Sequence, residues 1–399
     1  MKIFVDALSR IPTVSIGTQA LIIGCLQILR RQFPDATFVM LTGHPAQERH
    51  YLDATGYPIE YVTRASSQWG TLKQFRAIVR SVDAVACAWG DGFVGRPGRA
   101  IFQKALSLKT SNVPLVLVTA SLGPFRQGPD SLMARWALSL FDQLTVRDLN
   151  TQRHVQSLGL RDVPCLSDTA FVLDPAPDPV VDDLLRREGI PAHPVPIGIN
   201  PSILLYHRFP PLHGKPYITF MATLIAQVRR ITQRPIWLIP HQIYPADFPG
   251  LTPDILHSAN GDDRAAAEMI LDALASREGV YTLKGDYSQA AYKGVLKRCD
   301  LFIGGRMHAV ISAVSAGTPS VIMQYSHKAS GVMEMLKMSD WVWDIREPKS
   351  NLAGLIEKAW SGRSALSVRL AERRGRDAEV AYQLGDVFAE ALATRGART

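Results

Sequence analysis

Residues 301–331 read LFIGGRMHAVISAVSAGTPSVIMQYSHKASG, and this stretch decides the fold class of the chain. Its first apolar run stops at two glycines, and an apolar helical pattern begins around Arg306 and His308. A second short apolar run, over residues 319–323, ends in polar residues that include Lys328. A strand, a helix and a second strand in this order form one unit of a parallel α/β sheet. The stretch therefore predicts an open α/β fold.

The polar residues of this stretch fall where the predicted strands end. In an open α/β sheet, ligands bind at the carboxyl ends of neighbouring strands, and a helix N-terminus there favours anions. We therefore expect Arg306, His308 and Lys328 to converge on one crevice, beside the backbone of Gly304 and Gly305. Arg306 could instead hold loop carbonyls, and His308 could fill the core. Charged and imidazole groups directly after two glycines at a strand end nevertheless favour an anion site with a proton-transfer group.

Length and composition indicate a globular protein of two domains. The chain has 399 residues, of which 47% are hydrophobic. No run approaches the roughly 18 apolar residues that span a bilayer. The N-terminal MKIFVDALSR is short, has an acid at Asp6 and lacks a cleavage-site pattern, so it indicates a first strand rather than a signal peptide. We therefore expect a cytoplasmic protein.

The net charge of +8 is spread along the chain. No nucleic-acid recognition motif accompanies this charge, so we do not expect a nucleic acid as partner. A basic protein could favour anionic small substrates or an anionic membrane surface, which includes a peripheral contact at the inner face of the membrane. The four cysteines lie far apart without metal-ligand spacing, so we expect reduced thiols and no metal site. The sequence does not indicate the oligomeric state.

Strand-like runs alternate with helical patterns in both halves of the chain, which predicts parallel sheets covered by helices on both faces. The proline-rich segment 175–195 predicts a linker. We expect domains at 1–174 and 196–364, and a last helix in 365–399 that packs back on the first domain. The predicted class is α/β, with two doubly wound Rossmann-like domains facing each other across a cleft. This arrangement is typical of GT-B folds, but a fold alone does not name a reaction.

Residues 90–95 match G-x-G-x-x-G after a predicted strand. The dinucleotide-binding fingerprint normally follows the first strand and has an acid about 20 residues further on. Here the match follows a later strand, and no acid lies between Asp91 and Asp130. A dinucleotide site is therefore not predicted. A turn that lets a substrate approach the backbone at Gly90 stays open, with Asp91 as a candidate base.

Three further motifs lie at predicted strand ends. Gly17 and Thr18 join the first strand to the first helix, where Thr18 could be the N-cap, and a plain connection is as good an interpretation as substrate contact. Asp168 could orient a group of the cleft or cap a turn. His241 follows the strand 236–240 and would face the same crevice as Arg306.

Asp262 and Asp263 follow His241 at the start of a predicted helix. Capping of that helix is the commoner role for either aspartate. A metal site of His241 with both aspartates has weak support, because the spacing matches no known ligand pattern.

In this order, the motifs resemble those of the polysaccharide pyruvyl transferase family. The resemblance runs from about residue 10 to residue 335 and is strongest over 300–331. The matching pieces are Gly17-Thr-Gln-Ala20, Gly90-Asp-Gly92, Leu122-Gly-Pro124, Val146-Arg-Asp148, Ser167-Asp168, Pro240-His241, Asp262-Asp263, Gly305-Arg-Met-His308, Gly317-Thr-Pro319, Tyr325-Ser-His-Lys328 and Gly331. Many members carry an Asn and an acidic residue near the first glycine, where this chain has Ile16, Thr18 and Gln19.

The resemblance implies transfer of a pyruvyl group from phosphoenolpyruvate to a sugar of a surface polysaccharide or of its lipid-linked oligosaccharide precursor. The usual product is a cyclic ketal across two hydroxyls, and phosphate is released. Such a reaction needs no cofactor and no metal, because fixed cations can stabilise the developing charge.

The resemblance and the chemistry together assign roles to particular residues. Phosphoenolpyruvate carries two anionic groups and needs several cations. The expected donor-binding residues are Arg306, Lys328, Gly304, Gly305 and, as a second cation, Arg147. The candidates for proton transfer are His308, His241 and Asp91. The expected acceptor-binding residues are Gly17, Thr18, Gln19, Gly90 and Asp168.

Two other functions stay open. A glycosyltransferase with a nucleotide-sugar donor could use the same two-domain cleft, although no acid is placed to hold a ribose near Arg306. A carbohydrate-binding scaffold could stack sugars on Trp69 or Trp341. Trp89 and Trp343 lie inside apolar runs and are better explained as core residues.

Overall fold

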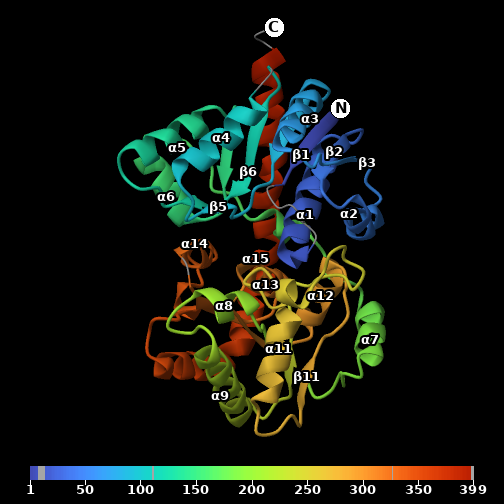
Figure 1. Ribbon diagram of the computed structural model, residues 1–399. Helices are drawn as coiled ribbons and strands as arrows, with labels where there is room; N and C mark the ends of the chain where they lie inside the picture. The colour runs from blue at the N-terminus through green and yellow to red at the C-terminus, as the bar shows by residue number, and fades with distance from the viewer. Residues whose placement is uncertain (8–13, 110–111, 326, 397–399) are drawn as a thin grey trace. The chain divides into compact units, whose positions relative to one another are not determined.

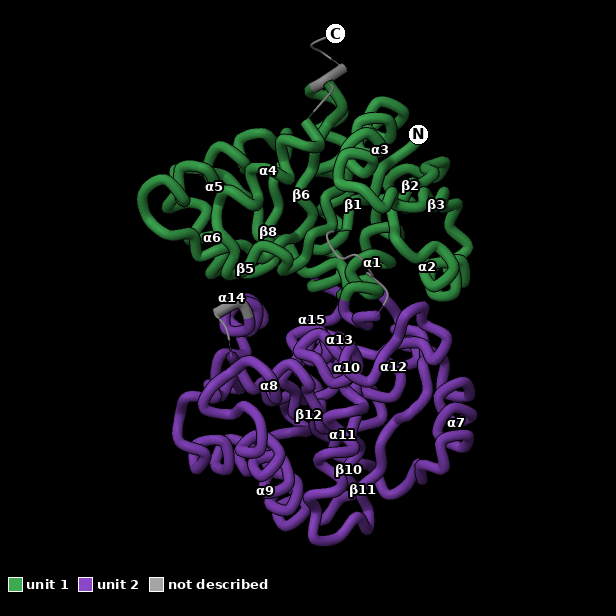
Figure 2. The backbone as a smooth tube through the Cα atoms, viewed as in Figure 1, with its two compact units in different colours: residues 1–13, 18–172, 377–399 green, residues 14–17, 173–376 purple. Residues whose placement is uncertain are grey.

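The computed structural model describes residues 1–7, 14–109, 112–325 and 327–396. The chain divides into two compact units, which Figure 2 shows in two colours. Unit 1 consists of residues 1–13, 18–172 and 377–399, and unit 2 consists of residues 14–17 and 173–376.

The sheet of unit 1 is entirely parallel, with the strand order β3-β2-β1-β4-β6-β8 (Figure 1). Its strands are β1 (Lys2–Asp6), β2 (Thr37–Thr42), β3 (Ile59–Thr63), β4 (Ala84–Cys87), β6 (Leu115–Ala120) and β8 (Gln143–Val146). The strand order reverses between β1 and β4, which is the position of the ligand crevice in doubly wound sheets. β4 and β6 are buried along their whole length, as expected when helices cover both faces of a parallel sheet.

Helices connect these strands. They are α1 (Ile16–Gln32), α2 (Pro45–Leu52), α3 (Gln68–Arg80), α4 (Gly98–Leu108), α5 (Pro129–Ser139) and α6 (Leu149–Ser157). Side-chain caps mark some of their starts: Ser67 accepts from Gly70 N at α3, and Asp148 accepts from Thr151 N at α6. Two short strands, β5 (Phe93–Val94) and β7 (Leu122–Gly123), pair beside the main sheet.

The sheet of unit 2 repeats the same parallel topology, with the order β11-β10-β9-β12-β13-β14. Its strands are β9 (Ile197–Ile199), β10 (Ile236–Leu238), β11 (Val280–Thr282), β12 (Leu301–Gly304), β13 (Ser320–Gln324) and β14 (Val342–Asp344). Here the order reverses between β9 and β12, so the stretch that opens at residue 301 supplies one side of the crevice position.

The helices of unit 2 cover this sheet. They are α7 (Asp178–Arg187), α8 (Ile203–Arg208), α9 (Lys215–Thr232), α10 (Pro253–Leu256), α11 (Asp263–Asp272), α12 (Gln289–Lys297), α13 (Met307–Ser315), α14 (His327–Met335) and the start of α15 (Lys349–Gly396). Two sheets of one doubly wound topology confirm the predicted α/β class with two Rossmann-like units. No helix within the described ranges is both long and apolar enough to cross a membrane.

Two elements differ from the expected organisation. Segment 175–195, where a linker was expected, contains α7 and belongs to unit 2. Val181, Leu184 and Leu185 recur at helical spacing and are buried, and a proline in the first turn does not interrupt a helix. The last helix begins at Lys349 rather than near 365, and its final part, from residue 377, belongs to unit 1.

Candidate active site

A buried ion pair forms the centre of the candidate site in unit 2. Arg306 follows β12 and is the N-cap residue of α13. Its Nε donates to Asp263 Oδ2 at 2.8 Å and its Nη2 donates to Asp263 Oδ1 at 2.7 Å. Asp263 is fully buried and also accepts from the backbone N–H groups of Ile203, His241 and Gln242. This network holds the guanidinium plane in one orientation.

Arg306 keeps its charge and one free nitrogen. Burial alone would lower the pKa of the guanidinium, but the facing Asp263 carboxylate outweighs burial and raises it. The Arg306 side chain is 13% exposed. Its Nη1 makes no hydrogen bond to any residue that the structure describes. That nitrogen is therefore the part of Arg306 that can bind an anionic ligand.

Asn200 connects the ends of the three strands around this pair, and the sequence analysis missed it. It follows β9, donates from Nδ2 to Ile239 O at 3.0 Å, and accepts from Arg306 N at Oδ1 at 3.2 Å. The available signal was an asparagine directly after a buried apolar strand, which is uncommon without a hydrogen-bonding reason.

His241 follows β10 and is buried, with only 2% of its surface exposed. Neither ring nitrogen has a hydrogen-bond partner among the described residues. Burial, followed by the nearby charges of His308 and Arg306, lowers the pKa of His241 well below its usual value. The imidazole is therefore neutral at pH 7, and its ring nitrogens can bind a ligand. Such an unsatisfied buried group is a typical sign of a functional site.

His308 lies in the first turn of α13 and is in close contact with Gly17. A Cβ atom at Gly17 would lie 2.5 Å from the Cβ of His308 and 2.8 Å from its Nδ1. Backbone hydrogen bonds hold this segment in unit 2: Ile16 N donates to His241 O, and Ile243 N donates to Val14 O. The backbone at Gly17 is thus in direct contact with His308.

The other predicted donor-binding residues of unit 2 have different surroundings. A Cβ at Gly304 would lie 2.6 Å from Phe302 Cε1, and one at Gly305 would lie 2.6 Å from Leu205 Cδ1, so packing favours glycine at both positions. No side chain caps the N-terminus of α13 among the described residues, and its first N–H groups favour an anion. The side chain of Lys328, in α14, lies outside the described residues, and its role stays a prediction.

Arg147 and Asp168 contact each other in unit 1. Arg147 Nη1 donates to Asp168 Oδ2 at 2.6 Å, and both side chains are fully buried. Arg147 Nε donates to Ser121 Oγ, which in turn donates to Asp148 Oδ2 at 2.7 Å. The sequence predicts Arg147 as a donor-binding residue and Asp168 as an acceptor-binding residue. Both belong to unit 1, where they form a buried ion pair at the end of β8.

The remaining predicted residues also belong to unit 1. Gly90 adopts φ +55°, which glycine tolerates best, and its carbonyl accepts from Ser121 N at 2.8 Å. Asp91 is exposed in the turn after β4. Thr18 is half-buried and Gln19 is buried, both in α1. No group of three or more His, Cys, Asp or Glu side chains in the described part of the chain could hold a metal ion.

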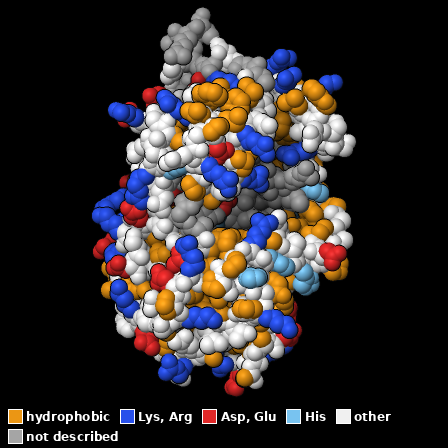
Figure 3. Space-filling model, turned by 60° about the vertical axis from the view of Figure 1, so that its left-hand side comes forward, with side chains coloured by type: hydrophobic (Ala, Val, Ile, Leu, Met, Phe, Trp, Pro, Cys, Tyr) orange, Lys and Arg blue, Asp and Glu red, His pale blue; other side chains and the backbone are white. Residues whose placement is uncertain are grey.

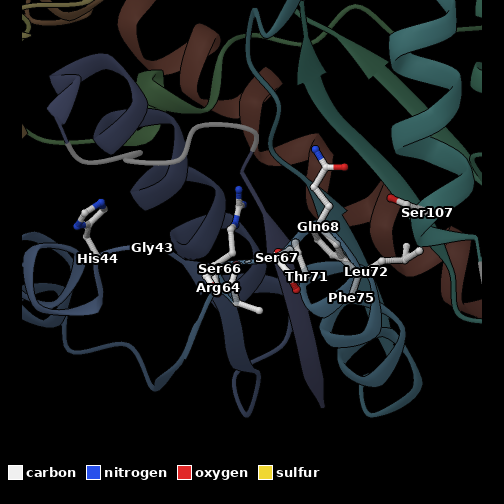
Figure 4. Close-up of a pocket in the computed structure, with 11 residues that line it drawn as sticks. Gly43, His44, Arg64, Ser66, Ser67, Gln68, Thr71, Leu72, Phe75 and Ser107 are labelled. Carbon is white, nitrogen blue, oxygen red and sulfur yellow. Dashed lines mark hydrogen bonds between the residues drawn. The ribbon is translucent and has the colours of Figure 1, made fainter.

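Unit 1 also contains a pocket of about 480 Å³ after the ends of β2 and β3 (Figure 4). Its lining residues are mostly polar: Gly43, His44, Arg64, Ala65, Ser66, Ser67, Gln68, Thr71, Leu72, Phe75 and Ser107. In Figure 4 the side chains of Arg64 and Gln68 point to the same side. The Nε of Arg64 is buried and has no hydrogen-bond partner among the described residues. Sequence reasoning missed this pocket because its residues follow two strands that carry no glycine motif.

Two doubly wound units of the same parallel topology define the GT-B class of fold. HepE from Anabaena in complex with UDP-glucose matches with a TM-score of 0.61 at 14% identity, over 98% of this chain and 99% of that chain. The UDP-GlcNAc 2-epimerase from Neisseria meningitidis bound to UDP-GlcNAc matches with a TM-score of 0.57 at 10% identity, over 99% and 100%. At these identities the likeness shows the fold alone.

Within this class, the chain belongs to the polysaccharide pyruvyl transferase family, whose model matches residues 16–327. It is also similar to the amylovoran biosynthesis protein AmsJ of Erwinia amylovora, at 22% identity over 293 residues. That match covers 69% of this chain and 64% of the length of AmsJ, so the chain spans less than two thirds of that relative. The family resemblance seen in the sequence is thereby confirmed.

Proposed function

We propose that the protein transfers the pyruvyl group of phosphoenolpyruvate to two hydroxyls of a sugar, forms a cyclic ketal and releases phosphate. The acceptor is a surface polysaccharide unit or its lipid-linked precursor, which would place the reaction at the inner face of the membrane. One observation carries the proposal: the bidentate Arg306–Asp263 pair lies with His241 and His308 at the switch point of unit 2. Family membership and the similarity to AmsJ support the general role.

The donor would bind through fixed positive charge. Phosphoenolpyruvate presents a carboxylate and a phosphate on three carbons. Arg306 Nη1 and the first N–H groups of α13 suit one of these anions, because both are held in place before the ligand arrives. The side chain of Lys328 would supply a second cation. Neither a cofactor nor a metal takes part in this scheme.

The chemistry requires two new C–O bonds and one proton on carbon. One sugar hydroxyl adds to C2 of phosphoenolpyruvate while the methylene C3 takes a proton and becomes a methyl group. The C2–O bond to phosphate then breaks, the second hydroxyl closes the ketal, and its proton leaves with phosphate. A histidine can move these protons near neutral pH. We assign proton transfer to His308. The neutral imidazole of His241 would form a hydrogen bond with the substrate. Asp91 stays a predicted base.

We assign the acceptor sugar to the pocket in unit 1. Its lining offers hydroxyls, an amide and one guanidinium, which suit the many hydroxyls of a sugar. Gly90 accepts a hydrogen bond from Ser121 N, and Asp168 pairs with Arg147. Their roles at the acceptor, like those of Thr18 and Gln19, stay predictions. Gly17 lies against His308, in unit 2.

A coupled assay tests the function. The protein should release inorganic phosphate from phosphoenolpyruvate only when a sugar acceptor is present. His308→Ala and Arg306→Ala should lose most of this rate. Phosphoenolpyruvate should also raise the melting temperature, because a ligand that binds only the native state stabilises it. Stabilisation by a UDP-sugar with no response to phosphoenolpyruvate would favour a glycosyltransferase instead. Sugar binding without turnover of any donor would favour a scaffold protein.

A further inference from the structure

Three helices on one side of unit 1 form a continuous layer, in which α4 packs against both α3 and α5. We call the outer surface of this layer the α3–α4–α5 face. Of the seven large hydrophobic side chains that are exposed in the described residues, five lie on these helices. They are Trp69 (73% exposed), Leu106 (51%), Leu132 (49%), Met133 (36%) and Trp136 (56%). Apolar side chains rarely gather in this way on a surface that contacts only water.

The same face is basic. Its exposed cations are Lys73, Arg76 and Arg80 on α3, Arg99 on α4 and Arg135 on α5. The single acid in the three helices is Asp130, which accepts from the backbone N–H groups of Gly98 at 2.6 Å and Arg126 at 3.0 Å. Figure 3 brings the side of Figure 1 that holds α5 forward and shows apolar side chains gathered on unit 1 with Lys and Arg beside them.

We propose that the α3–α4–α5 face rests on an anionic lipid bilayer. Tryptophan side chains favour the depth of the lipid headgroups, and leucine and methionine side chains can enter the acyl boundary below. Lysine and arginine are attracted to the negative surface potential of anionic lipids. The combination of exposed tryptophan, exposed aliphatic side chains and one sign of charge suits a membrane surface better than any other partner.

Two other partners fit the face less well. A symmetric dimer through this face would bring the cations of one copy against those of the other, and such like-charge contacts are unfavourable. A nucleic acid would match the charge, but Leu106, Leu132 and Met133 offer nothing to a phosphate backbone. The proposal concerns the place where the protein works and does not depend on the reaction that it catalyses.

Flotation of the full-length protein with lipid vesicles tests the proposal. The protein should float with vesicles that contain phosphatidylglycerol, float much less with pure phosphatidylcholine, and detach as salt is added. The double variant Arg76→Glu/Arg80→Glu should bind anionic vesicles at least about tenfold more weakly, because each cation near the surface contributes roughly fivefold. Leu132→Ser/Trp136→Ser should reduce binding even at low salt, because it removes the apolar part of the contact.

Matched changes elsewhere serve as controls. Val368→Ser and Arg376→Glu alter exposed residues of the same kinds on α15 in unit 2, and both should bind vesicles like the unaltered protein. Circular dichroism should show that every variant is folded. If the apolar variant proves unfolded, the charge-reversal variant alone decides. Equal binding to neutral and anionic vesicles, or equal loss in the controls, would overturn the proposal. The proposal would also be overturned if the protein bound no vesicles and instead formed a dimer that Leu132→Ser/Trp136→Ser disrupts.

Discussion

The backbone of Gly17 lies directly against the imidazole of His308, so close that a Cβ at position 17 would lie 2.5 Å from the Cβ of His308. The two residues come from opposite ends of the segment that matches the family model, residues 16–327. Because only glycine leaves room at position 17, this residue allows His308, the candidate proton-transfer group, to occupy its position. This contact also ties the start of α1 to the site in unit 2.

Gly17→Ala should displace His308. We expect turnover to fall on the order of 100-fold, because misplacing a catalytic group by about 1 Å has effects of this size. Phosphoenolpyruvate should still raise the melting temperature, since Arg306 is untouched. Steady-state kinetics with a thermal-shift titration checks both parts. Gly375→Ala is the control, because a Cβ there meets nothing within 4 Å. Unchanged turnover in Gly17→Ala would contradict the role of the contact.

Asp263→Asn should weaken both the fold and donor binding. Removal of one partner of a buried ion pair leaves the other charge unpaired, which costs about 3–5 kcal/mol. Urea unfolding measures this loss, and calorimetry with phosphoenolpyruvate measures donor binding. Asp262→Asn is the matched neighbour, because Asp262 caps α11 and asparagine can still cap. Equal effects of the two substitutions would show that Asp263 does not orient Arg306.

His241 should make unit 2 less stable in mild acid. Its pKa is lowered in the folded state by burial, His308 and Arg306, so the unfolded chain binds the proton more readily. Stability is therefore present above the unfolded pKa of about 6.5 and is lost as pH falls, by up to about 1.4 kcal/mol per pH unit. Urea unfolding at about pH 7 and at about pH 5 should show this loss of stability. The variant His241→Gln should not show it. The exposed His257→Gln should leave the pH dependence as it is.

Glu48, in unit 1, should make the protein less stable as pH rises, which is the opposite of the effect of His241. Burial raises the pKa of its carboxyl from 4.5 to about 8, although a hydrogen bond from Thr42 Oγ1 opposes this shift. The folded state therefore binds the proton more tightly than the unfolded chain. The resulting stability is present below an unfolded pKa of about 4.3 and is lost as pH rises towards the folded value, by a few kcal/mol at most.

The variant Glu48→Gln should lose this pH dependence, which urea unfolding from acid to mildly alkaline pH would measure. Glu60→Gln is the control, because Glu60 pairs with Lys2 at an exposed position. A pH dependence that persists in Glu48→Gln would mean that the carboxyl is ionised in the folded protein.

Arg64→Ala should weaken binding of the acceptor sugar and leave binding of phosphoenolpyruvate unchanged. We expect the KM for the sugar to rise about tenfold, as for loss of one hydrogen bond from a charged group, while the KM for phosphoenolpyruvate stays the same. Arg161→Ala changes an exposed arginine of unit 1 and serves as the control. An equal rise in both KM values would contradict the proposal that this pocket binds the acceptor sugar.

Local pattern was enough to predict most elements of both sheets. Both units show the predicted alternation of strands and helices, because the side-chain periods of strands and helices are properties of neighbouring residues. The local pattern did not predict the short polar helices. α2 has few apolar residues, and α7 lies among prolines, so both depend on packing that a local pattern does not display.

The arrangement of charges could not be read in this way. Asp262 and Asp263 are neighbours of one type, yet Asp262 caps α11 and Asp263 binds Arg306. Arg147 and Arg306 both follow strands, yet Arg147 is fully buried against Asp168 in unit 1. The sequence shows which ionisable groups stand at strand ends, since strand ends are local. Which of them become partners depends on distances set by the folded backbone, and at a few ångströms those distances determine both the charge and the orientation of each group.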